Sequence, residues 1–419
     1  MIPSLHQDAL KDLLRRAPLR RLLETFNTGE EETRIVGGAV RNALLGRPVT
    51  EVDCATTATP DLMAKLAAAA GFKPVPTGID HGTITVIVEG EPFEVTTLRE
   101  DVETDGRHAV VRFGRDFETD AKRRDFTINA LSLGLDGRLH DYTNGAADLA
   151  ARRVRFIGDA HKRIREDYLR ILRFFRFHAE YAQGEPDAEG LAASGAERQG
   201  LTILSRERIR HELMKLLAAR RAEDTVRVLA DHGFLTWILA GVGEFGRFGR
   251  IAATDDGGPV SIWRLAALAV LTEEDADRLR ERLRLSNEEH RRLASYGRLV
   301  ALLKTRPLPL DAAAIRRLVA EHGTETVAPV LIATAGEPLP VVQRDAWEAL
   351  KSFRSGAEPV PVFPLRGADL VAGGIEKGPR VGELMSQARQ AWLAEGCRTD
   401  GAYAKDLLRR VLEQAAAQG

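Results

Sequence analysis

The stretch from Arg34 to Thr57, RIVGGAVRNALLGRPVTEVDCATT, contains the pattern that decides the fold. Its first residues, Arg34-Ile35-Val36, form a short apolar run that predicts a strand. Gly37-Gly38 ends this run. A helix is predicted next, because apolar residues follow at helical spacing, namely Val40, Leu44 and Leu45. Gly46 is expected to end that helix.

A second strand is predicted around Glu51 and Asp53, which lie two residues apart. Because side chains alternate along a strand, the two carboxylates share one face. Carboxylate oxygens hold hard cations such as Mg²⁺, and the N–H groups of Gly37-Gly38 and of a helix N-terminus can bind phosphates. Alone, Gly-Gly is typical of a turn, and an acidic pair is typical of a solvated strand end. Together they favour a site for Mg²⁺ and a phosphate chain.

The composition indicates a globular protein of several domains. With 419 residues the chain can bury a large core, and two to four domains are expected. Its 60 Lys and Arg residues nearly balance 61 Asp and Glu residues, so a nucleic acid would have to bind at local basic patches. Cys54 and Cys397 are far apart in the sequence, which argues against a disulfide framework or a cysteine-based zinc site.

The sequence shows no membrane or export signal. No apolar run approaches the roughly 20 residues of a membrane span, and the N-terminus lacks the apolar core of a signal peptide. We therefore expect a soluble, cytoplasmic protein of bacterial type that does not associate with membranes.

The stretch 34–57 resembles the head-domain signature of class II nucleotidyltransferases, the tRNA CCA-adding enzymes and bacterial poly(A) polymerases. That signature reads GG-x-V-R-D-x-L-L-G, then D-x-D, then a nearby Thr. The chain matches it at Gly37, Gly38 and Arg41, which the resemblance implies hold the nucleotide triphosphate. Asn42 and Glu51 stand where the family has Asp. Glu51 keeps the charge on a side chain that is one methylene longer.

The resemblance also assigns the acidic residues of the head. Glu51 and Asp53 are implied to bind the metal. Glu94, in the segment FEVTTLRED of an expected strand from Phe93 to Leu98, matches the segment that supplies the third catalytic carboxylate. Without these neighbours, Glu94 would be interpreted as an exposed residue of an edge strand.

A second motif, RRDFTINAL, lies within a run from Thr119 to Leu135 whose apolar residues form a stripe. The resemblance implies that Arg124 and Asp125, with Asn129 on the same polar side, hold the sugar and phosphates of the incoming nucleotide. Arginine suits a bidentate grip on phosphate. Asp125 is expected to accept a hydrogen bond from a ribose 2′-OH, which would favour ribonucleotides.

The polar segment from Arg99 to His108 resembles the flexible loop of the family, which is linked to the change in nucleotide choice during addition. It contains Asp105-Gly106, a turn signal. A solvated hairpin loop is the alternative interpretation.

The basic stretch from Arg155 to Ala182 contains the base-reading motif. Asp167, Arg170, Arg173 and Arg176 recur every third residue, which predicts one ridge along a helix. EDYLR matches the family motif E-D-x-x-R, which implies that Asp167 and Arg170 hydrogen-bond the base of CTP or ATP, with Arg173 and Arg176 supporting base and phosphate. Asp accepts from the amino group that C and A share, and Arg donates to a ring acceptor. A solvated helix face is the alternative.

The remaining segments are predicted to be helical. Residues 205–217 resemble the neck motif E-R-I-x-x-E-L, in which Glu207, Arg208 and Glu212 are expected to make ion pairs between neck and head. Amphipathic helices are expected at 3–26, 221–231, 261–271 and 308–333, and a glycine turn before a helix in the tail resembles a C-terminal family motif. The tail motif is interpreted equally as a structural cap or as a contact to an RNA phosphate.

These expectations combine into an α+β protein, in which a mixed-sheet nucleotidyltransferase head is followed by an all-helical neck, body and tail. The expected boundaries are residues 1–150 for the head, 151–225 for the neck, 226–345 for the body and 346–419 for the tail. The body and tail are expected to bind RNA.

The expected reaction is the addition of C, C and A to a tRNA 3′ end from CTP and ATP. Two Mg²⁺ ions would assist the transfer, no nucleic-acid template would be needed, and no protein partner is implied. A poly(A) polymerase and an enzyme that adds only CC or only A are alternatives within the family. A non-catalytic RNA-binding protein, with Glu51 as the mark of a decayed metal site, is the alternative from another class.

Overall fold

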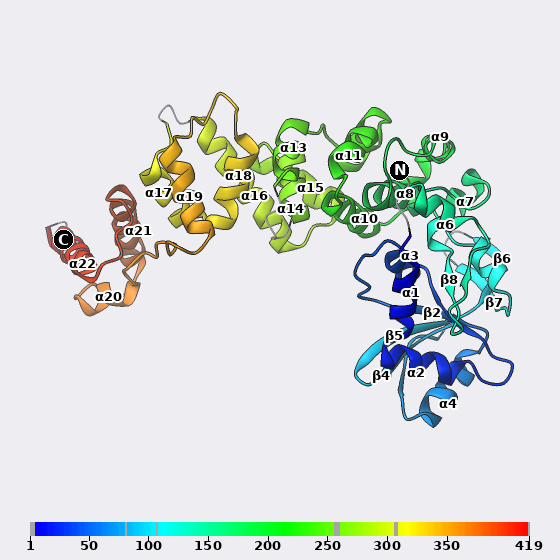
Figure 1. Ribbon diagram of the computed structural model, residues 1–419. Coiled ribbons are helices and arrows are strands. Elements are labelled where there is room, and N and C mark those ends of the chain that lie inside the picture. The colour runs from blue at the N-terminus through cyan, green and yellow to red at the C-terminus, as the bar shows by residue number, and fades with distance from the viewer. Residues whose placement is uncertain (1–4, 80–81, 106–107, 255–259, 306–308, 418–419) are drawn as a thin grey trace. The chain divides into compact units, whose positions relative to one another are not determined.

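The computed structural model describes residues 5–79, 82–105, 108–254, 260–305 and 309–417. The chain divides into two compact units, residues 1–232 and residues 233–419 (Figure 1). In the described ranges, no helix has both the length and the apolar character that a membrane crossing requires.

The first unit is built on a seven-stranded mixed sheet in the order β3-β4-β5-β2-β1-β8-β9. All neighbouring strands run antiparallel except β2 and β5, which are parallel. The strands are β1 (Thr33–Val36), β2 (Asp53–Thr56), β3 (Lys73–Gly78), β4 (Thr83–Val88), β5 (Glu91–Thr97), β8 (Ser132–Leu133) and β9 (Leu139–His140).

The predicted unit around Gly37 is confirmed. β1 is buried along its whole length, and α3 (Gly38–Leu44) begins directly after it. Gly37 has φ 66° and Gly46 has φ 62°, in the left-handed region that glycine adopts without a steric cost. The prediction that Glu51 and Asp53 lie on one strand is wrong: β1 ends at Val36, opposite Asp53, so the second strand starts at Asp53 and Glu51 lies in the loop that leads into it.

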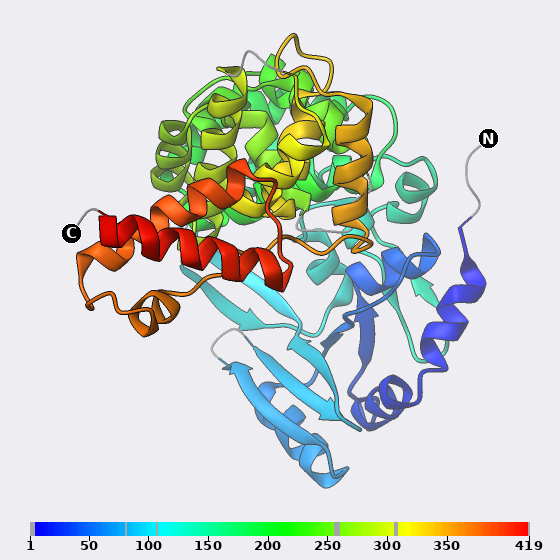
Figure 2. The same ribbon diagram turned by 90° about the vertical axis from the view of Figure 1, so that its left-hand side faces the viewer.

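The N-terminal segment forms two helices where one was predicted over residues 3–26. α1 (Gln7–Leu14) ends before Arg16, whose backbone is extended, and α2 (Ala17–Phe26) begins with a proline in its first turn. A proline lacks the backbone N–H, and its ring clashes with the carbonyl four residues earlier in a continuous helix, so Pro18 fits the first turn of α2 but not the interior of one long helix. Both α2 and α4 (Pro60–Ala69) contact strands of the sheet (Figures 1 and 2).

The segment predicted as a polar loop over residues 99–108 is instead part of a strand pair. β6 (Arg99–Asp105) and β7 (His108–Phe113) pair antiparallel in a two-stranded sheet, with a register shift between Asp101 and Glu103. The turn expected at Asp105-Gly106 falls at the end of β6, and residues 106–107 lie outside the described ranges.

The rest of the first unit is mainly helical. The run 119–135, whose apolar stripe predicted a helix, is helical only in part. α5 covers only Phe117–Lys122, and an irregular segment with one 3-10 turn, η2 (Thr127–Asn129), carries the RRDFTINAL motif. The further elements are α6 (Gly145–Ala150), α7 (Ala160–Glu166), α8 (Leu169–Tyr181), α9 (Ala188–Ala196), η3 (Arg198–Ile203), α10 (Arg206–Ala218) and α11 (Ala222–Asp231).

The expected helical ridge is interrupted at Asp167. This residue has extended backbone angles, φ −155° and ψ 105°, between α7 and α8, so it does not belong to the helix that carries Arg170, Arg173 and Arg176. Asp167 Oδ1 accepts a hydrogen bond from Leu169 N (3.1 Å) at the start of α8. A short acidic side chain that satisfies N–H groups of a first turn is typical of a helix start.

The second unit is all helical in its described residues apart from an isolated bridge between Leu310 and Val342. Residues 308–333 contain two helices where one segment was predicted, with Gly323 (φ 75°) between them. The helices are α12 (Phe234–Leu239), α13 (Phe245–Ala252), α14 (Val260–Ala269), α15 (Glu273–Leu283), α16 (Asn287–Lys304), α17 (Ala312–His322), α18 (Thr324–Thr334), α19 (Arg344–Arg354), α20 (Gly367–Ala372), α21 (Pro379–Ala394) and α22 (Gly401–Ala417).

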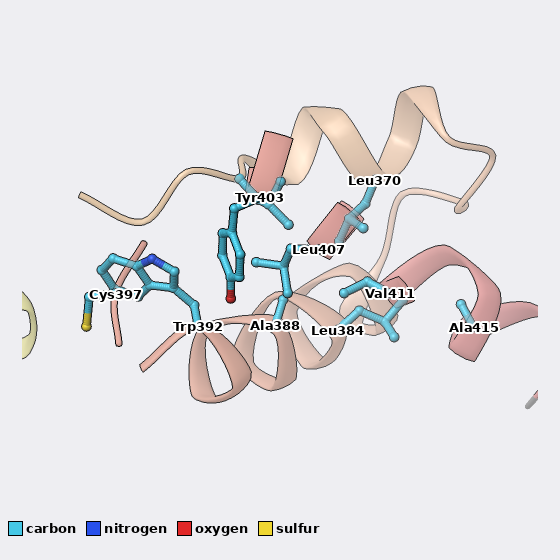
Figure 3. Close-up of a cluster of buried hydrophobic side chains, with 10 residues drawn as sticks. Leu370, Leu384, Ala388, Trp392, Cys397, Tyr403, Leu407, Val411 and Ala415 are labelled. Carbon is cyan, nitrogen blue, oxygen red and sulfur yellow. The ribbon is translucent and has the colours of Figure 1, made fainter. Parts of the chain in front are cut away.

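The last three helices share a core of their own. Trp392 is fully buried near Tyr403 in a cluster that also contains Leu407 and Leu384, with Leu384 lying farther along beside Val411 (Figure 3). The Trp392 indole N–H donates to Arg398 O (2.8 Å), so the buried ring leaves no unpaired donor.

Candidate active site

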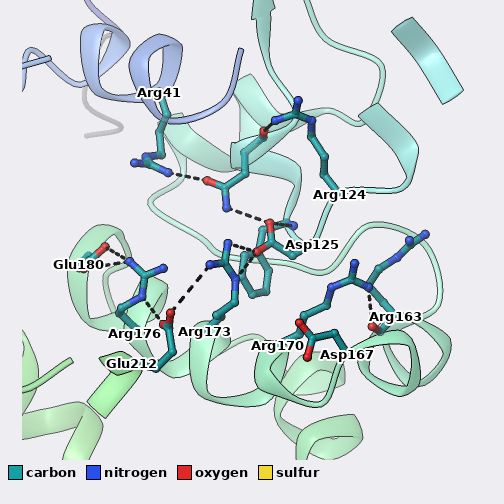
Figure 4. A network of polar contacts seen from close by, with 12 residues as sticks. Arg41, Arg124, Asp125, Arg163, Asp167, Arg170, Arg173, Arg176, Glu180 and Glu212 are labelled. Carbon is teal, nitrogen blue, oxygen red and sulfur yellow. Dashed lines mark hydrogen bonds and ion pairs between the residues drawn. The ribbon is translucent and has the colours of Figure 1, made fainter. Parts of the chain in front are cut away.

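A cavity of about 680 Å³ in the first unit collects every residue that the sequence indicated for catalysis or nucleotide binding. Loops and strand ends of the sheet form one side, and α8 forms the other (Figure 4). The predicted residues that line it are Gly37, Gly38, Arg41, Glu51, Asp53, Glu94, Arg124, Asp125, Asn129, Asp167, Arg170, Arg173 and Arg176.

The acidic part of the cavity depends on the parallel strand pair. Asp53 at the start of β2 is directly opposite Glu94 on β5 in the register, so the two carboxylates leave the sheet side by side. Burial raises the pKa of Asp53, and the nearby Glu94 and Glu51 raise it further, while Arg124 opposes the change. Negative charge gathered in this way favours a bound cation.

The donor set fits Mg²⁺ bound jointly by protein and substrate. In the described part of the chain, no group of three or more His, Cys, Asp or Glu residues is arranged to hold a metal ion by itself. Mg²⁺ commonly takes one or two protein carboxylates and completes its shell with phosphate oxygens and water. Asp53, with Glu51 or Glu94 beside it, supplies such a partial shell.

Arg41 is buried between the glycine turn and the last turn of α8. Its guanidinium donates to Asn129 Oδ1 (2.5 Å) and to the Tyr181 hydroxyl (2.8 Å), and it lies 4.1 Å from the centroid of the Tyr181 ring. Burial lowers the pKa of Arg41. A Cβ added at Gly37 would lie 3.2 Å from Arg124 Nη1, so glycine leaves room for that arginine beside the turn.

Asp125 accepts four hydrogen bonds and lies at the centre of the polar network in Figure 4. Oδ1 accepts from Phe126 N (2.8 Å) and Asn129 Nδ2 (3.0 Å), and Oδ2 accepts from Arg173 Nε (2.8 Å) and Nη2 (2.5 Å). Burial alone would raise the pKa of Asp125, but Arg173 and Asn129 hold it below its usual range. Because a carboxylate offers about four lone-pair sites, these donors already occupy the acceptor capacity of Asp125.

Arg176 and Arg173 share a buried partner from α10. Glu212 is 3% exposed; its Oε2 accepts from Arg176 Nε (2.6 Å), and its Oε1 lies 3.9 Å from Arg173 Nη1. Glu180 adds a longer contact to Arg176 (3.3 Å). Glu212 therefore makes ion pairs, but they join α10 to α8 within residues 151–225 and not to the head as predicted, and they fix two arginines of the cavity.

Asp167 and Arg170 both line the cavity, but they have different partners. Arg208 Nη2 donates to Asp167 Oδ2 (2.8 Å), whereas Arg170 Nη1 donates to Glu166 Oε2 (2.5 Å) and to Arg163 O (2.6 Å). The carboxylate and the guanidinium thus stand as two separately held groups.

Known proteins match this chain over most of its length. Residues 33–155 match the family described as "Poly A polymerase head domain", and residues 186–243 match "Probable RNA and SrmB- binding site of polymerase A". The CCA tRNA nucleotidyltransferase 1, mitochondrial, of Mus musculus is 37% identical over 386 residues, 91% of this chain and 87% of that protein. The CCA-adding enzyme of Lactobacillus gasseri is 30% identical over 89% of this chain and 92% of that protein.

The chain belongs to the CCA-adding tRNA nucleotidyltransferase family. It is therefore a nucleotidyltransferase.

Solved structures agree with this membership. The Bacillus stearothermophilus CCA-adding enzyme in complex with CTP has a TM-score of 0.72 at 25% identity, covering 96% of this chain and 98% of that one. The Thermotoga maritima CCA-adding enzyme complexed with tRNA shares the fold, with a TM-score of 0.69 at 19% identity, covering 99% of this chain and 100% of that one. The predicted nucleotidyltransferase fold with a mixed sheet and a helical remainder is confirmed.

Several lining residues, among them Asp120, Arg123 and Arg208, were not predicted as parts of the nucleotide site. Asp120, 4% exposed, accepts from Arg123 (2.6 Å) and Arg124 (3.2 Å), which hold its pKa below the usual range although burial opposes this. Arg123 lines the cavity beside it, and Arg208 was assigned only to an ion pair of the neck. The spacing of Asp120 to Arg123 and Arg124, three and four residues, is a helical pairing signal that could have revealed the first two.

Proposed function

We propose that the chain adds C, C and A to the 3′ end of tRNA from CTP and ATP, releasing pyrophosphate at each addition. The observation that carries this proposal is the convergence of every predicted nucleotide-binding and acidic residue on one cavity. Membership of the CCA-adding family supports the choice of tRNA, CTP and ATP as substrates.

The acidic residues are proposed to hold two Mg²⁺ ions, with Asp53 central and Glu51 and Glu94 beside it. When bound, Mg²⁺ lowers the pKa of a coordinated hydroxyl and neutralises charge on phosphate oxygens. Asp53 and Glu94 keep their spacing because they are fixed on adjacent parallel strands. In this arrangement the tRNA 3′-hydroxyl attacks the α-phosphorus, and the bond to the pyrophosphate oxygen breaks.

The triphosphate is proposed to lie along the glycine turn, Arg41 and Arg124. Each of these arginines already has a neutral or acidic partner in the protein, Asn129 for Arg41 and Asp120 for Arg124, so their guanidinium groups are oriented before the nucleotide arrives. Orientation before binding reduces the side-chain entropy that would be lost on binding.

Selection of the base is proposed to rest on Asp167 and Arg170. The carboxylate accepts from the exocyclic amino group of C or A, and the guanidinium donates to a ring acceptor of the same base. U and G present a different order of donors and acceptors, so a buried polar group would stay unpaired and the complex would be weaker. Arg173 and Arg176 support the base and phosphates from α8.

The decisive experiment is to incubate the enzyme with tRNA that lacks its 3′ end, with CTP and ATP together, and to sequence the products. We expect discrete CCA ends. A ladder of long A tails without C would contradict the proposal in favour of a poly(A) polymerase, and products that stop at CC would indicate partial addition. Incubation without divalent metal is the control for the proposed Mg²⁺ dependence.

Two further predictions from the sequence stay proposals. The first unit is proposed to contain a head over residues 1–150 and a neck over 151–225, with an RNA-binding body and tail following at 226–345 and 346–419. A cytoplasmic location is proposed from the sequence, although the relatives from Mus musculus and Homo sapiens are named as mitochondrial.

A further inference from the structure

Three arginines from separate segments gather at the C-terminal end of α8, outside the residues that line the nucleotide cavity. Arg47, in the loop after α3, donates through Nη2 to Glu180 O (2.8 Å). Arg152, just after α6, accepts through its backbone oxygen from Gln183 N (2.9 Å). These two contacts bring loops of the head and neck to the same helix end.

Arg220 is brought there by its neighbour. Arg221 N donates to Ala179 O (3.2 Å), which fixes the chain between α10 and α11 beside the last turn of α8. Arg220 itself is exposed to solvent. Its positive charge acts on the pKa of Arg152.

The charges of this cluster repel one another. Burial lowers the pKa of Arg152, and the like charges of Arg47 and Arg220 lower it further. Two like charges held close together are unfavourable unless an anion binds between them or solvent screens them. An arrangement of this kind favours an anionic ligand.

Arg152 also carries a backbone strain that glycine would avoid. It has φ 52°, a left-handed conformation that costs a non-glycine residue energy. Its Nε is buried and has no hydrogen-bond partner within the described ranges. A strained position occupied by a long cationic side chain with an unpaired donor indicates a role other than stabilising the fold.

Neutralisation of the helix end is the competing explanation, because cations near a helix C-terminus are favourable. Arg47, one of the three, and Arg221 already perform that task. Arg47 donates to Glu180 O, and Arg221 donates through Nη1 to Gly184 O (3.1 Å) and Ala182 O (3.4 Å). Arg152 and Arg220 add positive charge beyond these contacts.

We propose that Arg47, Arg152 and Arg220 bind a backbone phosphate of the tRNA substrate, at a site separate from the nucleotide cavity. The proposal rests on the proposed function for the choice of tRNA. Guanidinium groups match the geometry of phosphate oxygens, and phosphate contacts position an RNA without reading its sequence.

The test is tRNA affinity of the full-length protein without nucleotide, measured by fluorescence anisotropy over a range of salt concentrations. Arg152→Gly removes the side chain and relieves the left-handed backbone, so its melting temperature should equal or exceed that of the wild type. We expect its Kd for tRNA to rise several-fold and the slope of log K against log salt to fall by about 1, as for loss of one phosphate contact. Arg220→Gln, at an exposed position, should weaken binding in the same way.

Arg153→Gln is the matched control, because Arg153 adjoins Arg152 in sequence but is held by Asp148 (2.8 Å). It should leave the salt slope unchanged. Unchanged tRNA affinity and slope in both Arg152→Gly and Arg220→Gln would overturn the proposal, and so would an equal loss in Arg153→Gln. A change confined to the KM for CTP would overturn it in favour of a nucleotide phosphate. Wild-type protein that binds tRNA but adds no nucleotide would contradict the proposed function. The comparison of tRNA affinity between the wild type and the arginine variants would still test the phosphate site.

Discussion

Replacement of Asp125 by Asn distinguishes two possible roles of this carboxylate: holding Arg173 in place, and accepting a hydrogen bond from the ribose 2′-OH. The change keeps the shape of the side chain and removes the charge that faces Arg173. Asp125 is 7% exposed and the Arg173 side chain is 31% exposed, so the ion pair is buried on one side only. Removing one partner of a fully buried pair costs about 3–5 kcal/mol.

Two features reduce that cost here. The Arg173 side chain is partly exposed to solvent, and Glu212 lies 3.9 Å away as a second acidic neighbour. We therefore expect Asp125→Asn to lower the free energy of unfolding by about 2 kcal/mol. Urea unfolding at pH 7 measures this change in the free energy of unfolding. Asn129→Ala, which removes one neutral donor to the same carboxylate, is the variant with which it is compared.

The kinetic assay compares kcat/KM for CTP and dCTP on tRNA that lacks its 3′ end. Because four donors already occupy the Asp125 carboxylate, we expect it to act mainly by holding Arg173, and both values should fall by a similar factor. The reasoning is refuted if the preference for CTP over dCTP collapses by tenfold or more while stability stays unchanged. That result would return Asp125 to the role predicted from the sequence, an acceptor for the ribose 2′-OH.

The ion pair should also have a defined pH range. The pKa of Asp125 is lowered in the folded protein, so its stabilising effect is complete above the unfolded value, about 3.9, and is lost as the pH falls through the lower folded value. The difference in unfolding free energy between wild type and Asp125→Asn should therefore be constant above about pH 5 and shrink below about pH 4. A difference that widens on acidification would contradict this assignment.

Two other substitutions test the remaining parts of the cavity. Asp53→Asn should abolish nucleotide addition while tRNA binding survives. It should not lower the melting temperature at pH 7, because burial and the neighbouring Glu94 disfavour the charge that it removes; activity within a few-fold of wild type would disprove the metal assignment. Asp167→Ala should narrow the preference for CTP and ATP over UTP and GTP by about tenfold, roughly 1.4 kcal/mol. Four kcat/KM values that fall in parallel would show that Asp167 only anchors Arg208 and the start of α8.

The sequence predicted the elements whose signals are local. The strand before Gly37, the turn with positive φ and the helix after it depend on a short apolar run and two glycines, so spacing and composition were sufficient. Asp53 and Glu94, which were predicted as catalytic carboxylates, both line the cavity, and their catalytic role stays a prediction. Their side-by-side position on parallel strands was not predicted, because strand pairing depends on contacts between distant segments.

The parts that could not be predicted depend on tertiary partners. The three-residue spacing predicted that Asp167 lies on a continuous helix. In the structure its backbone is extended, and its carboxylate accepts hydrogen bonds from Leu169 N and from Arg208. Asp120 was missed because a buried acid that orients arginines has the same local sequence as a solvated helix pair. For Asp167 the deciding contact is the distant Arg208, and for Asp120, whose partners are local, it is burial that the local sequence does not show.

The one parallel step in the sheet has a consequence for synthesis of the protein. Parallel neighbours cannot be joined by a tight turn, and α4, β3 and β4 all intervene between β2 and β5 in the chain. A nascent chain that has emerged only as far as β4 therefore has Asp53 but no Glu94 beside it. The proposed acidic site is completed only when β5 inserts between β4 and β2, so Asp53 stays without this neighbouring carboxylate until the chain has been made as far as Thr97.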